Sequence, residues 1–225
     1  MGKSGLSGNY VADAAQSFKM ICIGLLDVAY SEVAAFGRIT SEWQENAITE
    51  LIAGRMNDNP TTIQMHITVI SEKKLVPDDL SHARPTVDNA PRIDIKIGGF
   101  EWSPQERRVT YYMEAKNLYS HDFKKSNNST VTQSSAYAKR YIHTGIDHLL
   151  NGYYPEDTLL LGYVLVGTVN EAVDIVNAHL KQQGRGSEEI TLAQISSFPH
   201  LVFGTSGHPG GKSIDHCYLL FEEIP

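Results

Sequence analysis

Asp94, Glu114 and Lys116 combine side-chain types and spacing that could perform chemistry. Asp94 lies in the segment 91–97, and Glu114-Ala115-Lys116 ends the segment 108–116, about twenty residues later. Two close carboxylates repel each other unless a cation joins them. Mg²⁺ suits such a pair, because it prefers hard oxygen ligands and lowers the pKa of a bound water molecule. With a lysine to handle a water molecule or an oxyanion, the pattern indicates metal-assisted hydrolysis of a phosphate ester.

Both segments have the side-chain alternation of β-strands. In 91–97 three isoleucines share one face, so Asp94 points to the other, and Glu114 and Lys116, two residues apart, also share a face. If the strands pair as a hairpin, Asp94 and Glu114 can approach each other. The alternative is a surface hairpin in which Asp94 forms a salt bridge with Lys116. Glu-Ala-Lys is predicted to end its strand before a polar loop, where functional sites are common.

The spacing of Asp94 and Glu114-Ala115-Lys116 resembles the PD-(D/E)xK nuclease superfamily, over roughly residues 40–166. In that family the first acid and the acid of E-x-K bind the metal, the carbonyl between Glu and Lys often joins them, and the lysine positions or activates water. By position these roles fall to Asp94, Glu114, the Ala115 carbonyl and Lys116. The chain departs from the family at Ile93, where the naming proline would stand. The resemblance implies Mg²⁺, which Mn²⁺ can replace, and nucleic acid as the substrate, with DNA favoured.

Many members of this superfamily add a glutamate from the first core helix. The segment 41–50 offers Glu42, Glu45 and Glu50, and we favour Glu45. The alternative is that Glu45 is a solvated helix acid. Which of these glutamates, if any, joins the metal site stays open at the level of sequence.

The segment 116–145 is basic and predicts the side that would hold nucleic acid. It contains five Lys or Arg residues against one Asp, whereas the whole chain has a formal net charge of −7. Gln133 and Tyr137 resemble the Q-x-x-x-Y element of the RecB-like branch, on the helix after E-x-K. A phosphate backbone needs such cations beside an acidic metal site; the other reading is a solvated helix with a lysine loop. The residues predicted to bind nucleic acid are Lys124, Lys125, Gln133, Tyr137, Lys139 and Arg140.

Hydrophobic periodicity and turn signals predict the helices and strands that must position these residues. The predicted elements indicate an α/β fold with a central mixed β-sheet flanked by helices, and the family resemblance implies that this fold is restriction-endonuclease-like. Residues 1–10 are expected to be disordered and 11–225 to form a single nuclease-like domain, with an N-terminal helix (11–36), a catalytic core (40–166) and a C-terminal helix and strands (167–225). Further helices are expected from Thr40 or Ser41 to 56, at 131–151 and at 169–183. Strands are expected at 64–71, 91–97, 108–116, 158–166, 200–205 and 215–222, with a loop at 77–91 and a turn at 98–105.

Composition limits the other classes of function. With 225 residues, 41% hydrophobic and 20% charged, the chain can bury a core. Its two cysteines, Cys22 and Cys217, form no CxxC motif, and we expect both to be small, buried apolar side chains. The apolar run 20–36 contains two acids and is too short to span a bilayer, so we expect a cytoplasmic protein with no membrane partner. The net acidity favours a homodimer or a partner subunit that supplies more basic surface.

Two further hypotheses stand beside a Mg²⁺-dependent nuclease that hydrolyses phosphodiester bonds of DNA, in a setting such as restriction, phage defence or repair. One is a catalytically inactive nuclease-like subunit that binds nucleic acid or serves assembly. The other is a nucleotide-binding protein that uses Lys212. The segment 206–213 resembles a phosphate-binding loop, but a strand, and no helix, is expected to follow it, so the phosphate cradle is missing.

Overall fold

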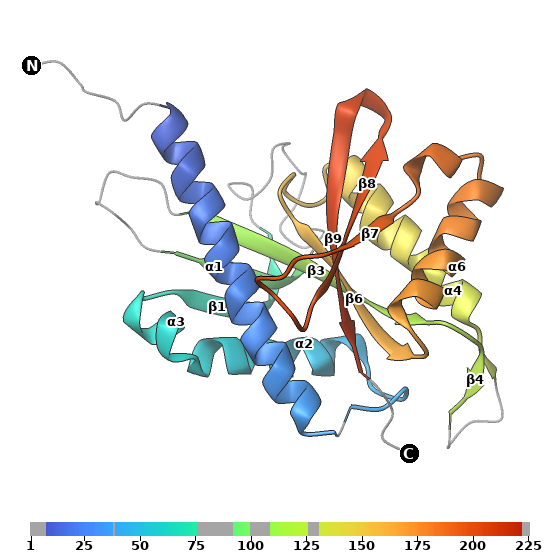
Figure 1. The fold of residues 1–225 in the computed structure, drawn as a ribbon, viewed down its shortest axis with the longest axis horizontal. Helices are drawn as coiled ribbons and strands as arrows, with labels where there is room; N and C mark the ends of the chain where they lie inside the picture. The colour runs from blue at the N-terminus through green and yellow to red at the C-terminus, as the bar shows by residue number, and fades with distance from the viewer. Residues whose placement is uncertain (1–7, 38, 76–91, 100–108, 126–130, 222–225) are drawn as a thin grey trace, which may run out of the picture.

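The computed structural model describes residues 8–37, 39–75, 92–99, 109–125 and 131–221, and its centre is a seven-stranded mixed sheet (Figure 1). The strand order is β1-β2-β3-β6-β9-β8-β7. The pairs β3–β6 and β6–β9 are parallel, and the other neighbours are antiparallel. The α/β class and the mixed sheet are as predicted.

The strands and helices have the following bounds. The strands are β1 (Thr68–Lys74), β2 (Arg92–Gly98), β3 (Thr110–Tyr119), β6 (Leu159–Val166), β7 (Thr191–Gln194), β8 (Val202–His208) and β9 (Lys212–Leu220), with a separate pair, β4 (Phe123–Lys124) and β5 (Val131–Thr132). The α-helices are α1 (Gly8–Ala35), α2 (Glu45–Asp58), α3 (Pro60–Gln64), α4 (Ser134–Arg140), α5 (Asp147–Leu150) and α6 (Val169–Gln182). A π-helix, η3 (Tyr141–Ile146), joins α4 to α5, and 3₁₀ turns occur at η4 (Gly186–Glu188) and η5 (Pro209–Gly211).

Helices cover both faces of the sheet and produce two apolar clusters. Leu26 of α1 and Ile52 of α2 pack in the first cluster with Met113 of β3. Tyr141 of η3 and Val173 of α6 pack in the second cluster, which includes residues of β6 and β9. Figure 1 shows α1 and α2 on one side of the strands and α4 and α6 on the other. Within the described chain, no helix is long and apolar enough to cross a membrane.

Strand β6 and helix α6 are where the sequence predicted them. β6 is apolar along its length and almost wholly buried at the centre of the sheet, as a strand covered on both faces should be. α6 begins with a capping box, in which Thr168 accepts from the Glu171 N–H and the Glu171 carboxylate accepts from the Thr168 N–H. The chain leaves α6 through Gly184 at φ 75°, a conformation that glycine adopts without steric cost. The two cysteines are buried, as expected.

The predicted N-terminal boundaries need correction. α1 begins at Gly8, so three residues assigned to a disordered tail are helical, and residues 1–7 lie outside the described residues. α2 begins at Glu45, because Thr40 closes a separate turn through its carbonyl and the Trp43 N–H. The strand predicted from 64 begins at Thr68. Asn59 caps a short helix, α3, over Pro60–Gln64, which takes up the start of that segment.

Later boundaries differ as well. β3 continues three residues past Lys116, so Glu-Ala-Lys does not end its strand. The helix predicted for 131–151 is interrupted: Val131 and Thr132 pair with β4, and the helix begins at Ser134 and passes through the π-turns of η3. β8 and β9 are offset from 200–205 and 215–222, and β7, four mostly exposed residues, was not predicted. The predicted loop 77–91 and most of the turn 98–105 lie outside the described residues.

Candidate active site

The hairpin predicted to carry the two carboxylates is present. β2 and β3 are antiparallel, and their register runs from Gly98 opposite Thr110 to Ile95 opposite Met113, the residues next in the chain to Asp94 and Glu114. The Asp94 Oδ2 atom accepts a hydrogen bond from the Ala115 N–H at 2.6 Å. The Asp94 carboxylate is therefore tied to the backbone of the E-x-K strand between Glu114 and Lys116.

One detail of the predicted alternation is wrong. Ile95 packs in the first apolar cluster, but Ile93 packs in the second, so the three isoleucines do not share one face. The pairs on either side, Ser71–Ile95 and Lys73–Ile93, keep a common register. Between them Glu72 has φ 51°, outside the extended region, so the regular pleat is interrupted beside Asp94.

Lys116 lies among three carboxylates, and we call Lys116, Glu114, Asp94 and Glu45 the Lys116 cluster. Its Nζ atom is 2.5 Å from Glu114 Oε1, 3.4 Å from Glu45 Oε1 and 3.9 Å from Asp94 Oδ2. It also donates to the Ala115 carbonyl at 2.6 Å. Each of the four residues is at most 7% exposed. The structure thus brings together all four residues that the sequence analysis assigned to catalysis.

Glu45 joins the cluster because it is the first residue of α2, where the helix begins beside the carboxyl end of β3. Its Oε2 accepts from the Asn117 N–H at 3.2 Å, and its Oε1 accepts from Arg140 at 3.2 Å. The other two candidates are placed differently: Glu42 precedes the helix, and Glu50 is exposed on it. The tertiary structure therefore favours Glu45 among the three glutamates.

The electrostatics of the Lys116 cluster are dominated by burial. Burial raises the pKa of Asp94 well above its usual value, and the Glu114 charge raises it further, against the opposing effect of Lys116. Burial also raises the pKa of Glu114, although the Lys116 ammonium opposes this. Burial works to lower the pKa of Lys116, but the charges of Glu114, Glu45 and Asp94 outweigh it, and the net shift is upward. The lysine is held as an ammonium, whereas burial favours the protonated forms of Asp94 and Glu114.

The carboxylate and carbonyl oxygens of the Lys116 cluster are ligands of the kind that a hard divalent cation prefers, although Lys116 bonds some of them in this structure. Among the described residues, no three His, Cys, Asp or Glu side chains are arranged to hold a metal ion. The Lys116 ammonium occupies the Ala115 carbonyl and Glu114 Oε1, two of the proposed donors. Glu114 Oε2, however, is buried and has no hydrogen-bond partner. An unpaired buried carboxylate oxygen is costly, and a cation would satisfy it.

Two residues of the site were not predicted from the sequence. The Tyr154 hydroxyl donates to Glu114 Oε1 at 2.9 Å, and the Asn117 amide donates to the Trp43 carbonyl at 3.0 Å. Asn117 directly follows Lys116, so its place beside E-x-K is a local signal that could have found it. Tyr154 is forty residues from Glu114 and lies in the segment after α5. Its pairing depends on tertiary packing alone.

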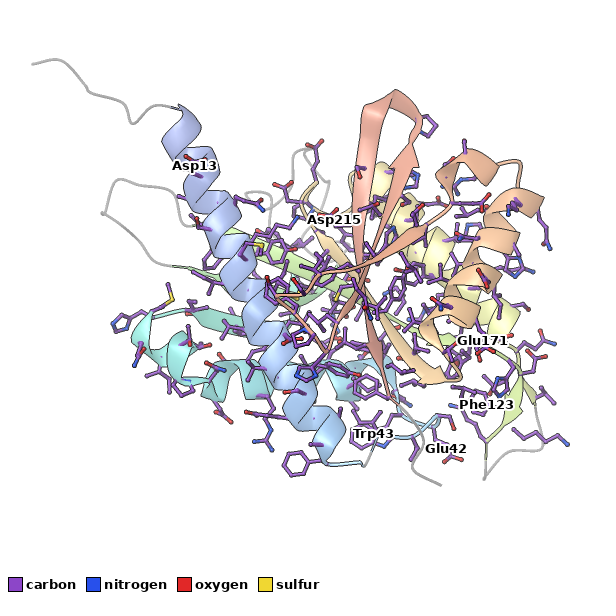
Figure 2. All side chains as sticks on the ribbon, viewed as in Figure 1. Asp13, Glu42, Trp43, Phe123, Glu171 and Asp215 are labelled. Carbon is purple, nitrogen blue, oxygen red and sulfur yellow. The ribbon has the colours of Figure 1, made fainter. Side chains whose placement is uncertain are left out.

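A pocket of about 170 Å³ opens beside Glu45, and three of the residues predicted to bind nucleic acid, Lys125, Tyr137 and Arg140, line it. Tyr137 packs edge-on against Tyr119 at a centroid distance of 4.5 Å. Figure 2 labels Trp43 on the segment before α2, and Phe123 on β4. The pocket is lined by Trp43, Gln44, Glu45, Asn46, Asn117, Tyr119, Lys125, Tyr137 and Arg140.

The remaining predicted nucleic-acid residues do not line this pocket. Lys124 is exposed on β4, Lys139 is exposed on α4, and Gln133 is exposed immediately before α4. Arg140, next to Lys139 in the chain, is the cation that reaches Glu45. The structure thus separates the six residues into a group at the pocket and a group on the outer surface.

In comparisons with known proteins, no family model, no curated protein and no solved structure matches the chain.

Proposed function

We propose that the chain is a metal-dependent nuclease that hydrolyses phosphodiester bonds, with DNA as the favoured substrate and Mg²⁺ or Mn²⁺ as the cofactor. The observation that carries the proposal is the Lys116 cluster itself. Asp94, Glu114 and Glu45 come from three different elements and converge on one lysine within 3.9 Å. Placing three acids around a buried lysine is costly for stability, so a chemical use is a physical reason for it.

Each residue has a role that follows from its contacts. Asp94, Glu114 and the Ala115 carbonyl are the oxygen donors for the metal, which when bound lowers the pKa of a water molecule and stabilises charge on the phosphate. Lys116, kept protonated by its neighbours, orients water or donates to a developing oxyanion. Glu45 and Tyr154 hold Lys116 and Glu114 in position, because they contact these two side chains directly.

The pocket beside Glu45 supplies the substrate side of the proposal. Arg140 and Lys125 are cations suited to phosphate oxygens, and Tyr137 presents an aromatic ring for stacking. Lys124, Lys139 and Gln133 lie outside the pocket, where they could contact more distant phosphates. The net charge of −7 supports a further element of the proposal, a homodimer or partner subunit that adds basic surface.

The burial of the cluster favours a second candidate. Asp94, Glu114 and Lys116 are each at most 7% exposed, and the ammonium already satisfies several of the proposed ligand atoms. An enzyme must expose these atoms to its substrate, whereas a catalytically inactive subunit that binds nucleic acid through Arg140 and Lys125 need not. This alternative predicts binding without cleavage.

A cleavage assay with matched variants separates the two candidates. The wild-type chain is incubated with supercoiled, linear and single-stranded DNA, with Mg²⁺, with Mn²⁺ and with EDTA. Cleavage that EDTA abolishes, and that is lost in Glu114→Gln and Lys116→Ala with DNA binding retained, supports the nuclease.

Glu45→Gln should reduce cleavage, and Glu50→Gln, an exposed glutamate on the same helix, is its control. Equal cleavage by wild type, Glu114→Gln and Lys116→Ala would refute the assignment. Metal-independent binding without cleavage would favour the inactive subunit.

A further inference from the structure

A second polar assembly lies on the opposite side of β6 from β3 and plays no part in the proposed chemistry. Glu188, His208, Ser206, His216 and Tyr141, which we call the buried relay, form one continuous chain of hydrogen bonds. The links are Glu188 Oε2 to His208 Nδ1 at 2.6 Å, His208 Nε2 to Ser206 Oγ at 2.7 Å, Ser206 Oγ to His216 Nε2 at 2.8 Å, and His216 Nδ1 to the Tyr141 hydroxyl at 2.8 Å.

The buried relay is enclosed by protein. Ser206 is 2% exposed, and His216 and Tyr141 have no exposed surface. Buried polar groups are costly unless each is hydrogen-bonded, and here both nitrogens of both imidazoles have a partner. The chain continues from Tyr141, whose hydroxyl donates to Tyr218 at 3.3 Å. Such a complete chain constrains the position of every hydrogen along it.

Charged groups surround the His208 end. Arg185 donates to Glu188 Oε2 at 2.7 Å and pairs with Asp147 at 2.7 Å. The hydrogen bond from Arg185 lowers the pKa of Glu188, burial opposes it, and His208 adds to the lowering, so Glu188 is ionised. On β9, Lys212 pairs in register with His208, and its Nζ donates to the Leu150 carbonyl at 3.0 Å. His208 therefore shares the Glu188 carboxylate with Arg185, and Lys212 is its partner on the neighbouring strand.

The other imidazole stays neutral. Burial lowers the pKa of His216 to about 3, and the nearby charge of His208 contributes to the lowering. A neutral imidazole carries one N–H and one acceptor nitrogen, so His216 can change only its tautomer. Ser206 has one hydroxyl hydrogen and can donate it to His208 or to His216, but not to both.

These constraints permit two arrangements. When His208 is protonated, it donates to Ser206, Ser206 donates to His216 Nε2, and His216 Nδ1–H donates to Tyr141. When His208 is neutral, with its N–H toward Glu188, Ser206 donates to His208. His216 then donates from Nε2 to Ser206, and Tyr141 turns its hydroxyl hydrogen to His216 Nδ1. The donation from Tyr141 to Tyr218 corresponds to the first arrangement.

We propose that the buried relay is a proton-responsive switch, in which protonation of His208 reverses every hydrogen bond from Ser206 to Tyr141 and exchanges the tautomer of His216. The input end lies next to the turn Pro209–Gly211, which lines an open pocket of about 560 Å³ together with His208 and Lys212. The output end, Tyr141, is the first residue of η3.

The output end adjoins the other site. Arg140 directly precedes Tyr141 and contacts Glu45, and the Thr144 carbonyl of η3 accepts from Tyr154 at 3.5 Å. π-turns are frequent at functional sites. The switch itself is independent of the proposed nuclease activity, because its evidence and its test involve no metal and no substrate.

The test is the tautomer of His216 in the wild-type chain. Long-range ¹H–¹⁵N spectra of the histidine side chains are recorded from about pH 5 to 8, the range in which histidine titrates. We expect the Nδ1 and Nε2 shifts of His216 to exchange as His208 gains its proton, while His216 remains neutral. A single His216 tautomer throughout the titration of His208, or no titration of His208 in this range, would overturn the proposal.

Two variants sharpen the result. Ser206→Ala removes the link between the imidazoles, so the tautomer of His216 should no longer change with pH. Tyr218→Phe removes the hydroxyl that accepts from Tyr141 in the first arrangement but leaves every link from Glu188 to Tyr141 in place, so the exchange should still occur, and exposed His200 serves as an internal reference. If Ser206→Ala does not fold, the wild-type titration and Tyr218→Phe still decide, because loss of the exchange in Tyr218→Phe contradicts the proposed end of the chain.

Discussion

Replacement of Lys116 by Met tests whether charge, and not packing, holds the candidate site together. The substitution keeps an unbranched side chain and removes the ammonium that lies 2.5–3.9 Å from three buried carboxylates. Removing one partner of a buried ion pair costs about 3–5 kcal/mol, because the remaining charge is left uncompensated. We expect a loss in this range near pH 8, a large part of a typical total stability of about 5–15 kcal/mol.

The loss should depend on pH with a defined sign. The pKa values of Asp94 and Glu114 are already raised in the folded chain, and without Lys116 they rise further. The folded variant therefore binds more protons than the unfolded chain at pH values between the unfolded and folded pKa. Its stability is recovered as the pH falls through the folded pKa toward about 4, the ordinary value of a carboxyl group.

Urea unfolding followed by circular dichroism from pH 8 to pH 5 measures the difference. Lys139→Met, an exposed lysine on α4, is the matched control and should change stability by less than about 0.5 kcal/mol. If Lys116→Met loses the same free energy at pH 5 as at pH 8, the repulsion among the carboxylates is not the cause.

Three further predictions concern the framework around both polar sites. A Cβ at Gly162 would lie 2.5 Å from the Tyr218 ring, so Gly162→Ala should lower the free energy of unfolding by about 1–3 kcal/mol. Gly54→Ala, in α2 with open space around it, should raise the free energy of unfolding by roughly 0.5–1 kcal/mol. Thermal unfolding measures both, and the reverse order of stability would contradict the packing. Thr168→Ala removes the capping box of α6 and should cost about 1 kcal/mol, a fall in Tm of roughly 2–4 °C; an unchanged Tm would mean that the cap contributes little. For His216, whose pKa is about 3 against 6.5 unfolded, stability should be complete above about pH 6.5 and fall by about 5 kcal/mol toward pH 3, because the unfolded chain binds a proton that the buried imidazole does not. His216→Gln should lose this part of the pH dependence, and an unaltered pH slope would show that another group is responsible.

Local patterns along the sequence determined the framework of this protein. The apolar run at β6 indicated a central strand, the helix predicted at 169–183 matches α6 to within one residue, and the strands predicted at 91–97 and 108–116 correspond to the antiparallel pair β2 and β3. These properties depend on side chains within a few residues of one another. The two-residue spacing of Glu114 and Lys116 predicted their common direction for the same reason.

Only the tertiary structure decided which distant residues meet. Glu45 was the favoured one of three candidate glutamates, but only the start of α2 set it beside Lys116, and Tyr154 reached Glu114 through the packing of the segment after α5. The buried relay joins Ser206 to Tyr141 across β9 and η3, an arrangement that no local pattern announces. Contacts over such sequence separations depend on strand register and helix packing. Strand register and helix packing are specified by the side chains of the whole core together, and no single motif specifies them.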